Sequence, residues 1–139
     1  MILNCAIIDE DPEALALLKH YVEETPSLNL IGAYHNAIEA VDGIHHSHLD
    51  ILFLAIHMQQ ISGLEFAKLV PMNVKIIFTT AFKEYAIEAY KVNAFDYLVK
   101  PILYEDFMQT CQKVFDHYMQ DDAYNPIKRD GFVVVKNES

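Results

Sequence analysis

Three segments of the chain carry side chains that together could hold a phosphoryl group. The acidic pair Asp9-Glu10 follows the apolar run at residues 2–8. Thr80 and Lys100 each follow a later apolar run. Two neighbouring carboxylates offer the oxygen ligands that a hard divalent cation prefers, and the cation and an ammonium group would neutralise phosphoryl oxygens. These residue types favour phosphoryl-transfer chemistry, provided that the fold brings them together.

One position in this pattern lacks the group that the chemistry needs. Ala55 closes the apolar run at residues 51–54, and the loop that follows, residues 56–63, would suit an aspartate at position 55 far better. An alanine methyl group has no atom that can attack phosphorus or coordinate a cation. The pattern therefore predicts a phosphorylation pocket without its nucleophile.

The composition is that of one folded domain. The chain has 139 residues, of which 53% are hydrophobic, which is enough for one core and too little to expect two domains. Twenty acidic and ten basic side chains give a formal charge of −10, which disfavours binding to nucleic acid through phosphates. Any contact with DNA would need another module.

The two cysteines and the hydropathy indicate the compartment. Cys5 and Cys111 lie far apart within apolar periodic segments, which predicts buried free thiols in a reducing compartment. No apolar run approaches the roughly 20 residues that span a bilayer. Residues 1–6 lack the basic flank of a secretory signal. We therefore expect a cytoplasmic protein that does not contact a membrane.

Apolar runs alternate with segments of helical periodicity along the chain. Strands are predicted at residues 2–8, 28–34, 49–55, 74–79 and 95–99. Helices are predicted at residues 12–24, 36–46, 62–70 and 82–90, and a last, long helix begins at residue 103. The order of elements is therefore (βα)5, an α/β arrangement.

This order of elements predicts where the reactive side chains lie. Strands joined by helices imply right-handed crossovers and a mostly parallel sheet covered on both faces. We predict a flavodoxin-like, doubly wound parallel sheet with the strand order 2-1-3-4-5, which binds ligands at the carboxyl ends of its strands. Asp9, Ala55, Thr80 and Lys100 all lie at such ends. We therefore expect them at one edge of the sheet.

Four segments at these strand ends together resemble the receiver domain of two-component response regulators. They are IIDEDP at 7–12, ILFLAIHMQQISG at 51–63, FTTAF at 78–82 and FDYLVKP at 95–101. The resemblance covers residues 1–119. It implies a signalling domain that receives a phosphoryl group from a sensor histidine kinase on an aspartate of its own.

The resemblance implies a cation site at the acidic pair. Asp9 and Glu10 would bind Mg²⁺, with the backbone carbonyl of His57 as a third ligand. Such a cation loses one anionic ligand where Ala55 stands, so its affinity should fall. We therefore expect Mg²⁺ to bind weakly or not at all, and Lys100 to turn toward Asp9 or Glu10.

The resemblance also implies the residues that would act on and report a phosphoryl group. Thr80 would be the switch hydroxyl, and Tyr97 would be the aromatic side chain that changes rotamer. Lys100 would be the catalytic cation, with Pro101 behind a cis peptide bond that fixes its direction. Ala55 occupies the position of the acceptor aspartate.

Two departures from the family pattern fall in one loop. Ala55 replaces the acceptor, and Gln59 stands where the family has proline directly after Met58. The leading interpretation is a pseudo-receiver, which is not an enzyme and acts through partner binding or a shift of a pre-existing equilibrium. The alternative is a phosphoryl-accepting receiver whose aspartate was replaced artificially.

The end of the chain resembles the start of a second domain. Residues 120–130 are polar and contain Asn125-Pro126, which predicts a linker. Residues 131–139 open with an apolar strand that resembles the first strand of a LytTR DNA-binding domain. The resemblance implies a transcription regulator that contacts DNA only through that truncated domain. Homodimers would form through the fourth helix, the fifth strand and the last helix.

Overall fold

A computed structural model describes residues 1–46, 48–85, 91 and 94–124. Met1–Tyr104 form one compact unit, and Glu105–Ser139 form a second. All the residues that the sequence places around the predicted pocket belong to the first unit.

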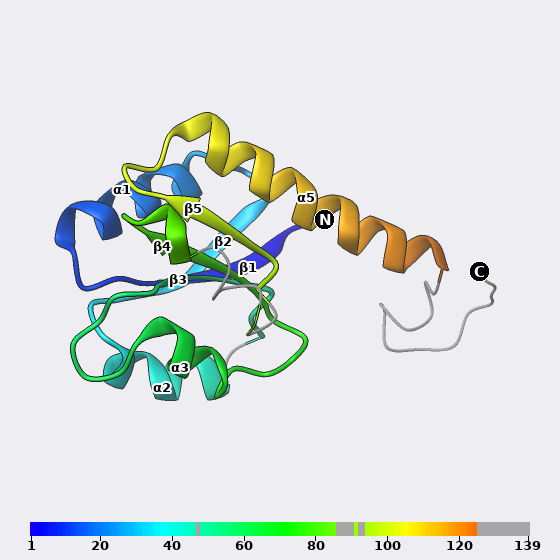
Figure 1. The fold of residues 1–139 in the computed structure, drawn as a ribbon. Helices are drawn as coiled ribbons and strands as arrows, with labels where there is room; N and C mark the ends of the chain where they lie inside the picture. Colours follow the sequence, from blue (N-terminus) through cyan, green and yellow to red (C-terminus); the bar gives the residue numbers. More distant parts are fainter. Residues whose placement is uncertain (47, 86–90, 92–93, 125–139) are drawn as a thin grey trace. The chain divides into compact units, whose positions relative to one another are not determined.

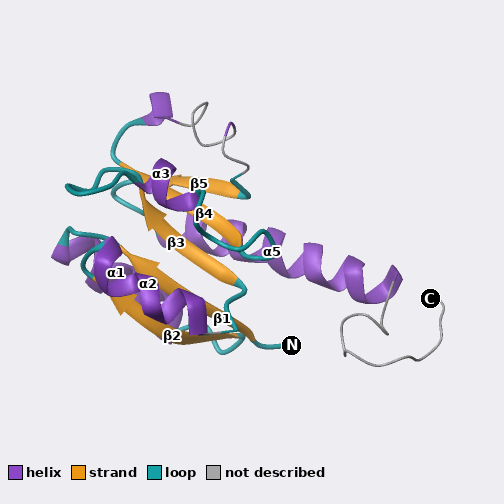
Figure 2. Cartoon of the chain, turned by 90° about the horizontal axis from the view of Figure 1, so that it is seen from below, coloured by secondary structure: helices purple, strands orange, loops and turns teal. Residues whose placement is uncertain are grey.

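A five-stranded parallel sheet forms the centre of the first unit (Figures 1 and 2). Its strands are β1 (Leu3–Ile8), β2 (Leu28–Tyr34), β3 (Ile51–Ala55), β4 (Lys75–Thr80) and β5 (Asp96–Val99). Neighbouring strands pair in parallel, in the order β2-β1-β3-β4-β5. This confirms the predicted flavodoxin-like sheet and its strand order, with every strand end within two residues of the predicted one.

The central strands are buried because helices cover both faces of the sheet. α1 (Pro12–Glu23) lies on one face, and α2 (Ala37–His46) and α3 (Gly63–Ala67) lie on the other (Figure 1). All five residues of β3 are buried, and in β1 only Asn4 is partly exposed. A parallel strand covered on both faces has no position that favours a polar side chain, which explains the unbroken apolar runs.

Helix α1 begins at Pro12, separated from the acidic pair Asp9-Glu10 by one residue, because the local sequence caps it. The side chain of Asp11 accepts a hydrogen bond from the N–H of Glu13 over 3.1 Å, and Pro12 occupies the first turn. The buried face of the helix consists of Ala14, Leu15, Leu18 and Val22. Packing of this face holds the loop that carries the acidic pair.

Helix α3 is shorter than the predicted helix at residues 62–70. After Ala67 the chain makes tighter hydrogen bonds between residues three apart, such as the one from Leu69 N–H to the carbonyl of Phe66 over 2.9 Å. Pro71 disfavours a helical backbone in the residue before it. The apolar periodicity therefore continues past the point where the α-helix ends.

The predicted fourth helix at residues 82–90 is described only at its start. A single 3-10 turn, η1 (Lys83–Tyr85), lies there. Residues 86–90 are outside the described part of the chain. The fourth helix, and the dimer surface to which it would contribute, stay predictions.

Helix α5 (Tyr104–Tyr124) extends into the segment that was predicted to be a linker from residue 120. Its buried residues recur at helical spacing and are Phe107, Thr110, Cys111, Val114 and Tyr118. No proline or glycine interrupts the helix before Asn125-Pro126, where proline disfavours helical backbone in the residue before it. The rest of the predicted linker and the predicted second domain lie outside the described residues.

Two further expectations concern the thiols and the membrane. Cys5 and Cys111 are buried and form no disulfide, which confirms the prediction of buried thiols. Among the described residues, no helix is both long enough and apolar enough to cross a membrane.

Candidate functional site

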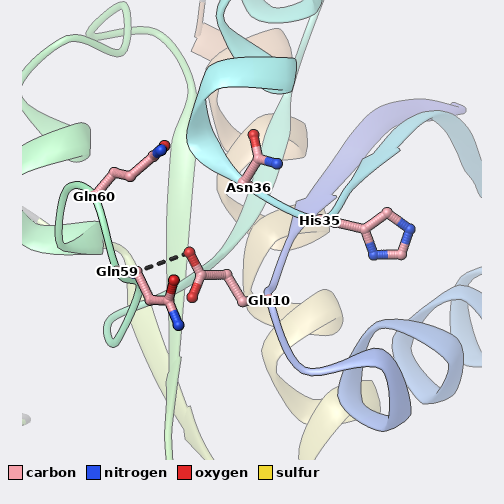
Figure 3. Close-up of a pocket in the computed structure, with 5 residues that line it drawn as sticks. All are labelled: Glu10, His35, Asn36, Gln59 and Gln60. Carbon is pink, nitrogen blue, oxygen red and sulfur yellow. Dashed lines mark hydrogen bonds between the residues drawn. The ribbon is translucent and has the colours of Figure 1, made fainter.

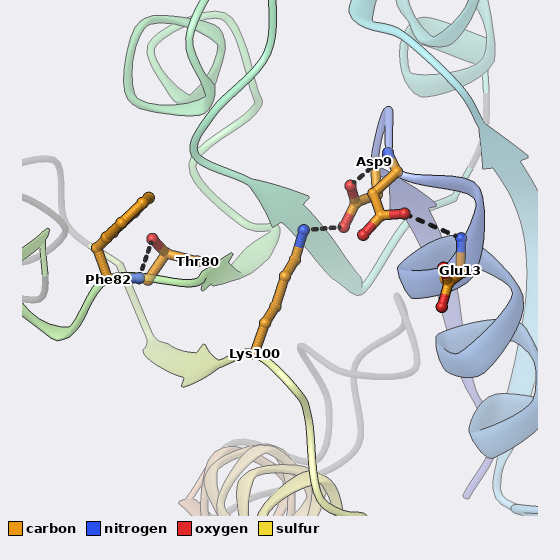
Figure 4. A network of polar contacts seen from close by, with 6 residues as sticks. Asp9, Glu13, Thr80, Phe82 and Lys100 are labelled. Carbon is orange, nitrogen blue, oxygen red and sulfur yellow. Dashed lines mark hydrogen bonds and ion pairs between the residues drawn. The ribbon is translucent and has the colours of Figure 1, made fainter.

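Four of the predicted pocket residues lie at the carboxyl edge of the sheet, and Figure 4 shows Asp9, Thr80 and Lys100 among them. Asp9 directly follows β1, and Ala55 is the last residue of β3. Thr80 is the last residue of β4, and Lys100 directly follows β5. Parallel pairing aligns these ends, because Ala55 lies beside Thr79 in the sheet. The prediction that these residues share one edge is confirmed.

Lys100 forms an ion pair with Asp9 across this edge (Figure 4). Its Nζ lies 2.8 Å from Oδ2 of Asp9, whose side chain is 2% exposed, against 21% for Lys100. The other carboxylate oxygen, Oδ1, accepts the N–H of Asp11 over 3.0 Å. Apart from Lys100, no described residue donates a hydrogen bond to Oδ2 of Asp9. The buried carboxylate is therefore neutralised by the chain itself, as expected for Lys100.

The backbone of Lys100 is held beside Thr80. The N–H of Lys100 donates to the carbonyl of Thr80 over 2.7 Å, and the peptide bond between Lys100 and Pro101 is cis, as predicted. The Thr80 side chain is buried, and its Oγ1 accepts the N–H of Phe82 over 3.0 Å (Figure 4). The predicted switch hydroxyl is thereby tied to the loop that follows β4.

Glu10 forms a hydrogen bond with a partner other than those of Asp9. Its Oε2 accepts the backbone N–H of Gln59 over 2.9 Å (Figure 3). A polar pocket of about 320 Å³ adjoins this contact and is lined by Glu10, His35, Asn36, Gln59 and Gln60. The two carboxylates of the acidic pair thus have separate partners.

The ligand set of a divalent cation is not assembled in this arrangement. Within the part of the chain that the structure describes, no group of three or more His, Cys, Asp or Glu side chains could hold a metal ion. Asp9 faces Lys100, and Glu10 accepts a hydrogen bond from the neighbouring loop. A hard cation such as Mg²⁺ needs several oxygen ligands directed at one point. The predicted pair of metal ligands does not fit Mg²⁺ as the side chains lie here.

The side chain of His57 belongs to an aromatic cluster that the sequence did not indicate. Its ring centroid lies 5.2 Å from that of Phe82 and 4.7 Å from that of Tyr85, with nearly perpendicular rings. The cluster joins the loop after β3 to the first turn after β4. No spacing rule reveals such a contact, because it depends on how two loops fold. The predicted role of the His57 carbonyl as a metal ligand stays a prediction.

Tyr97, the predicted switch aromatic, lies on β5 beside Phe78 of β4. It is partly buried and packs against the core on the side of the sheet that α2 and α3 cover. The structure therefore places it on the edge strand β5, two residues before the carboxyl end of that strand. Its change of rotamer stays a prediction.

The loop after β3 folds back onto Ala55. The N–H of Gly63 donates to the carbonyl of Ile56 over 2.7 Å. A Cβ atom on Gly63 would collide with the carbonyl oxygen of Ala55, so this close approach requires glycine. Ala55 is 1% exposed. The loop therefore seals the end of β3 and fixes the direction in which residues 56–63 leave the sheet.

Comparison with known proteins identifies the family. The model of the response regulator receiver domain matches residues 5–112. The chain is 39% identical over 102 residues to the transcriptional regulatory protein BtsR of Escherichia coli (strain K12), a match that covers 72% of this chain and 43% of BtsR. It is 34% identical over 127 residues to an uncharacterized response regulatory protein of Vibrio cholerae, covering 90% of this chain and 53% of that protein. The chain thus spans about half the length of the curated relatives it matches.

Solved structures show the same fold. The response regulatory domain of protein mrkE from Klebsiella pneumoniae matches with a TM-score of 0.76 and 24% identity, covering 85% of this chain and 99% of that one. The chemotaxis protein CheY4 of Vibrio cholerae matches with a TM-score of 0.72 and 22% identity, covering 82% and 99%. Together with the family match and the strand order, these likenesses lead to one conclusion: the chain belongs to the response regulator receiver domain family.

Proposed function

We propose that this receiver domain signals without accepting a phosphoryl group. The observation that carries the proposal is the place of Ala55, which is buried at the end of β3, on the edge where Lys100 and Asp9 form their ion pair. In this family the acceptor aspartate is expected at that place. A methyl group has no lone pair with which to attack phosphorus. On this proposal the domain is a pseudo-receiver and not an enzyme.

The ion pair between Lys100 and Asp9 supports the proposal through its charge balance. A buried carboxylate that lacks a partner is strongly disfavoured, so Asp9 requires a positive charge. Lys100 supplies that charge from 2.8 Å. A divalent cation would have to displace the lysine and also gather further oxygen ligands. We therefore infer that Mg²⁺ binds weakly and that the edge is stable without it.

Such a domain would signal through its partners. A protein with two conformations responds to any partner that binds one of them better, with or without phosphorylation. The relatives are named as transcriptional or response regulatory proteins, and the chain spans about half of their length. We propose a cytoplasmic two-component regulator of transcription, in which a sensor kinase or another protein acts on this domain. A LytTR-type domain would contact DNA, and pairing through the fourth helix, β5 and α5 would form the dimer.

A second candidate is a phosphoryl-accepting receiver whose natural residue at position 55 is aspartate. The arrangement of Thr80 and Lys100 favours it, because both still lie at the pocket edge. Gln59 disfavours it, because it is a second departure in the same loop. The codon for residue 55 in the source gene separates the two candidates, since an aspartate codon there would rule out the pseudo-receiver.

Titration with beryllofluoride and Mg²⁺ tests the proposal on the protein itself. Amide shifts of Thr80 and Tyr97 should not respond in the unchanged chain, because residue 55 offers no carboxylate. Ala55→Asp should give a saturable response if Asp9, Glu10, Thr80 and Lys100 are competent. Ala55→Asn, which matches aspartate in shape but lacks the charge, should stay silent. A saturable response of the unchanged chain would refute the proposal.

A further inference from the structure

Gln59, which departs from the family pattern in the loop after β3, provides the hydrogen-bond donor to Glu10. The backbone N–H of Gln59 donates to Oε2 of Glu10 over 2.9 Å and so joins two loops that are 49 residues apart in sequence (Figure 3). A hydrogen bond from a backbone N–H to a carboxylate is stronger than one between neutral groups, because the acceptor is charged. The bond therefore sets where the Glu10 carboxylate lies.

This contact depends on the type of residue at position 59. Proline has no backbone N–H and could not donate. Proline is the residue that the receiver pattern places directly after the methionine that is Met58 in this chain. The donor is the backbone of Gln59, so any residue except proline could make the bond. The departure from proline is thus the change that gives Glu10 its partner.

We propose that Gln59 keeps divalent cations from this edge by holding one of the two carboxylates that would bind them. The inference rests on the proposed pseudo-receiver function and deepens it. Lys100 forms an ion pair with Asp9, and the backbone N–H of Gln59 donates a hydrogen bond to Glu10, so groups of the chain itself contact both carboxylates. Weak cation binding then has two separate causes, which are the missing carboxylate at position 55 and the engaged carboxylate at position 10.

Binding of MnCl₂ to the full chain, followed through the relaxation of water protons, tests this inference. Gln59→Pro removes the donor, and we expect the affinity for Mn²⁺ to rise about two- to tenfold, the range expected for one solvent-exposed hydrogen bond. The double variant Ala55→Asp/Gln59→Pro should bind Mn²⁺ more tightly than Ala55→Asp by the same factor. Gln59→Ala keeps the N–H and should bind Mn²⁺ as weakly as the unchanged chain. Equal tightening by Gln59→Ala, or none by Gln59→Pro, would overturn the inference.

A second measurement avoids the proline substitution and its effect on folding. The Gln59 N–H should exchange with deuterium about two- to tenfold faster in Glu10→Ala than in the unchanged chain, because its acceptor is gone. The Gly63 N–H, which donates to the carbonyl of Ile56, is the internal control and should keep its rate. An unchanged rate at Gln59 would overturn the inference. A response of the unchanged chain to beryllofluoride would instead refute the pseudo-receiver function and leave this exchange result standing.

Discussion

The ammonium group of Lys100 and the carboxylate of Asp9 lie 2.8 Å apart at the carboxyl edge of the sheet, and the Asp9 side chain is almost fully buried. Removal of the lysine would leave a buried charge without a partner. We expect Lys100→Met to lower the free energy of unfolding by about 2 to 3 kcal/mol, which is below the loss for a fully buried pair because Lys100 is partly exposed. Urea denaturation at neutral pH measures the change.

Lys68 provides the matched control for this prediction. Its Nζ lies 3.3 Å from Glu65, and both side chains are 61% exposed. Lys68→Met should change the free energy of unfolding by less than about 1 kcal/mol. The double variant Asp9→Asn/Lys100→Met should recover most of the loss, because no buried charge remains. Equal losses in the two lysine variants would contradict the prediction.

Two adjacent threonines on β4 should respond in opposite ways when they lose their hydroxyl groups. Oγ1 of Thr79 is buried and has no hydrogen-bond partner within the described residues, whereas Oγ1 of Thr80 accepts the N–H of Phe82. Thr79→Val should raise the free energy of unfolding by about 1 kcal/mol, and Thr80→Val should lower it by about the same amount. Thermal and urea unfolding of the two variants would detect the difference. Stabilisation by Thr80→Val would argue against the observed bond.

The aromatic cluster of His57, Phe82 and Tyr85 should show energetic coupling between its two loops. Truncation of either His57 or Phe82 breaks the same ring contact, so the second truncation costs less than the first. We expect a double-mutant cycle of His57→Ala and Phe82→Ala to give a coupling energy of about 1 kcal/mol. His35, an exposed histidine at the same edge of the sheet, serves as the control. Coupling of His35→Ala with Phe82→Ala as large as that of His57→Ala would contradict the ring contact.

The Cys5 thiol should make stability fall at alkaline pH. Burial raises its pKa from 9.0 to about 12, and the charge of Asp50 adds to the shift. Between these values the folded chain keeps a proton that the unfolded chain releases, so the free energy of unfolding should decrease as the pH rises above about 9. Cys5→Ala should remove this contribution. Urea unfolding of both chains at pH 8 and pH 10 gives, for each chain, the decrease in the free energy of unfolding between the two pH values. A smaller decrease for Cys5→Ala isolates the contribution of the thiol, and equal decreases would contradict the buried, protonated thiol.

The sheet and the position of the site could be predicted from the sequence because both follow from topology. A run such as residues 51–55 is apolar throughout because helices cover both faces of β3. Asp9, Thr80 and Lys100 meet because parallel strands present their carboxyl ends at one edge, whatever their side chains do. The errors lie at helix ends, where hydrogen bonds between residues three apart replace the α-helix after Ala67 and the absence of proline or glycine lets α5 continue to Tyr124.

Contacts between loops could not be predicted in the same way. The hydrogen bond from Gln59 to Glu10 and the rings of His57 and Phe82 depend on how separate loops fold toward each other. Periodicity and strand order carry no information about these approaches. The residue types did signal that the loop was unusual, through Ala55 and Gln59, but the sequence did not show which partner each would have.

Under the proposed pseudo-receiver function, the hydrogen bond between Gln59 and Glu10 also bears on which mutations would create a phosphoryl-accepting site. A single change at residue 55 would return a nucleophile to an edge where one of the cation ligands is still bound elsewhere. A change at residue 59 alone would release that ligand but supply no nucleophile. On that proposal the two positions are coupled, because the gain from a carboxylate at position 55 depends on whether residue 59 carries a backbone N–H.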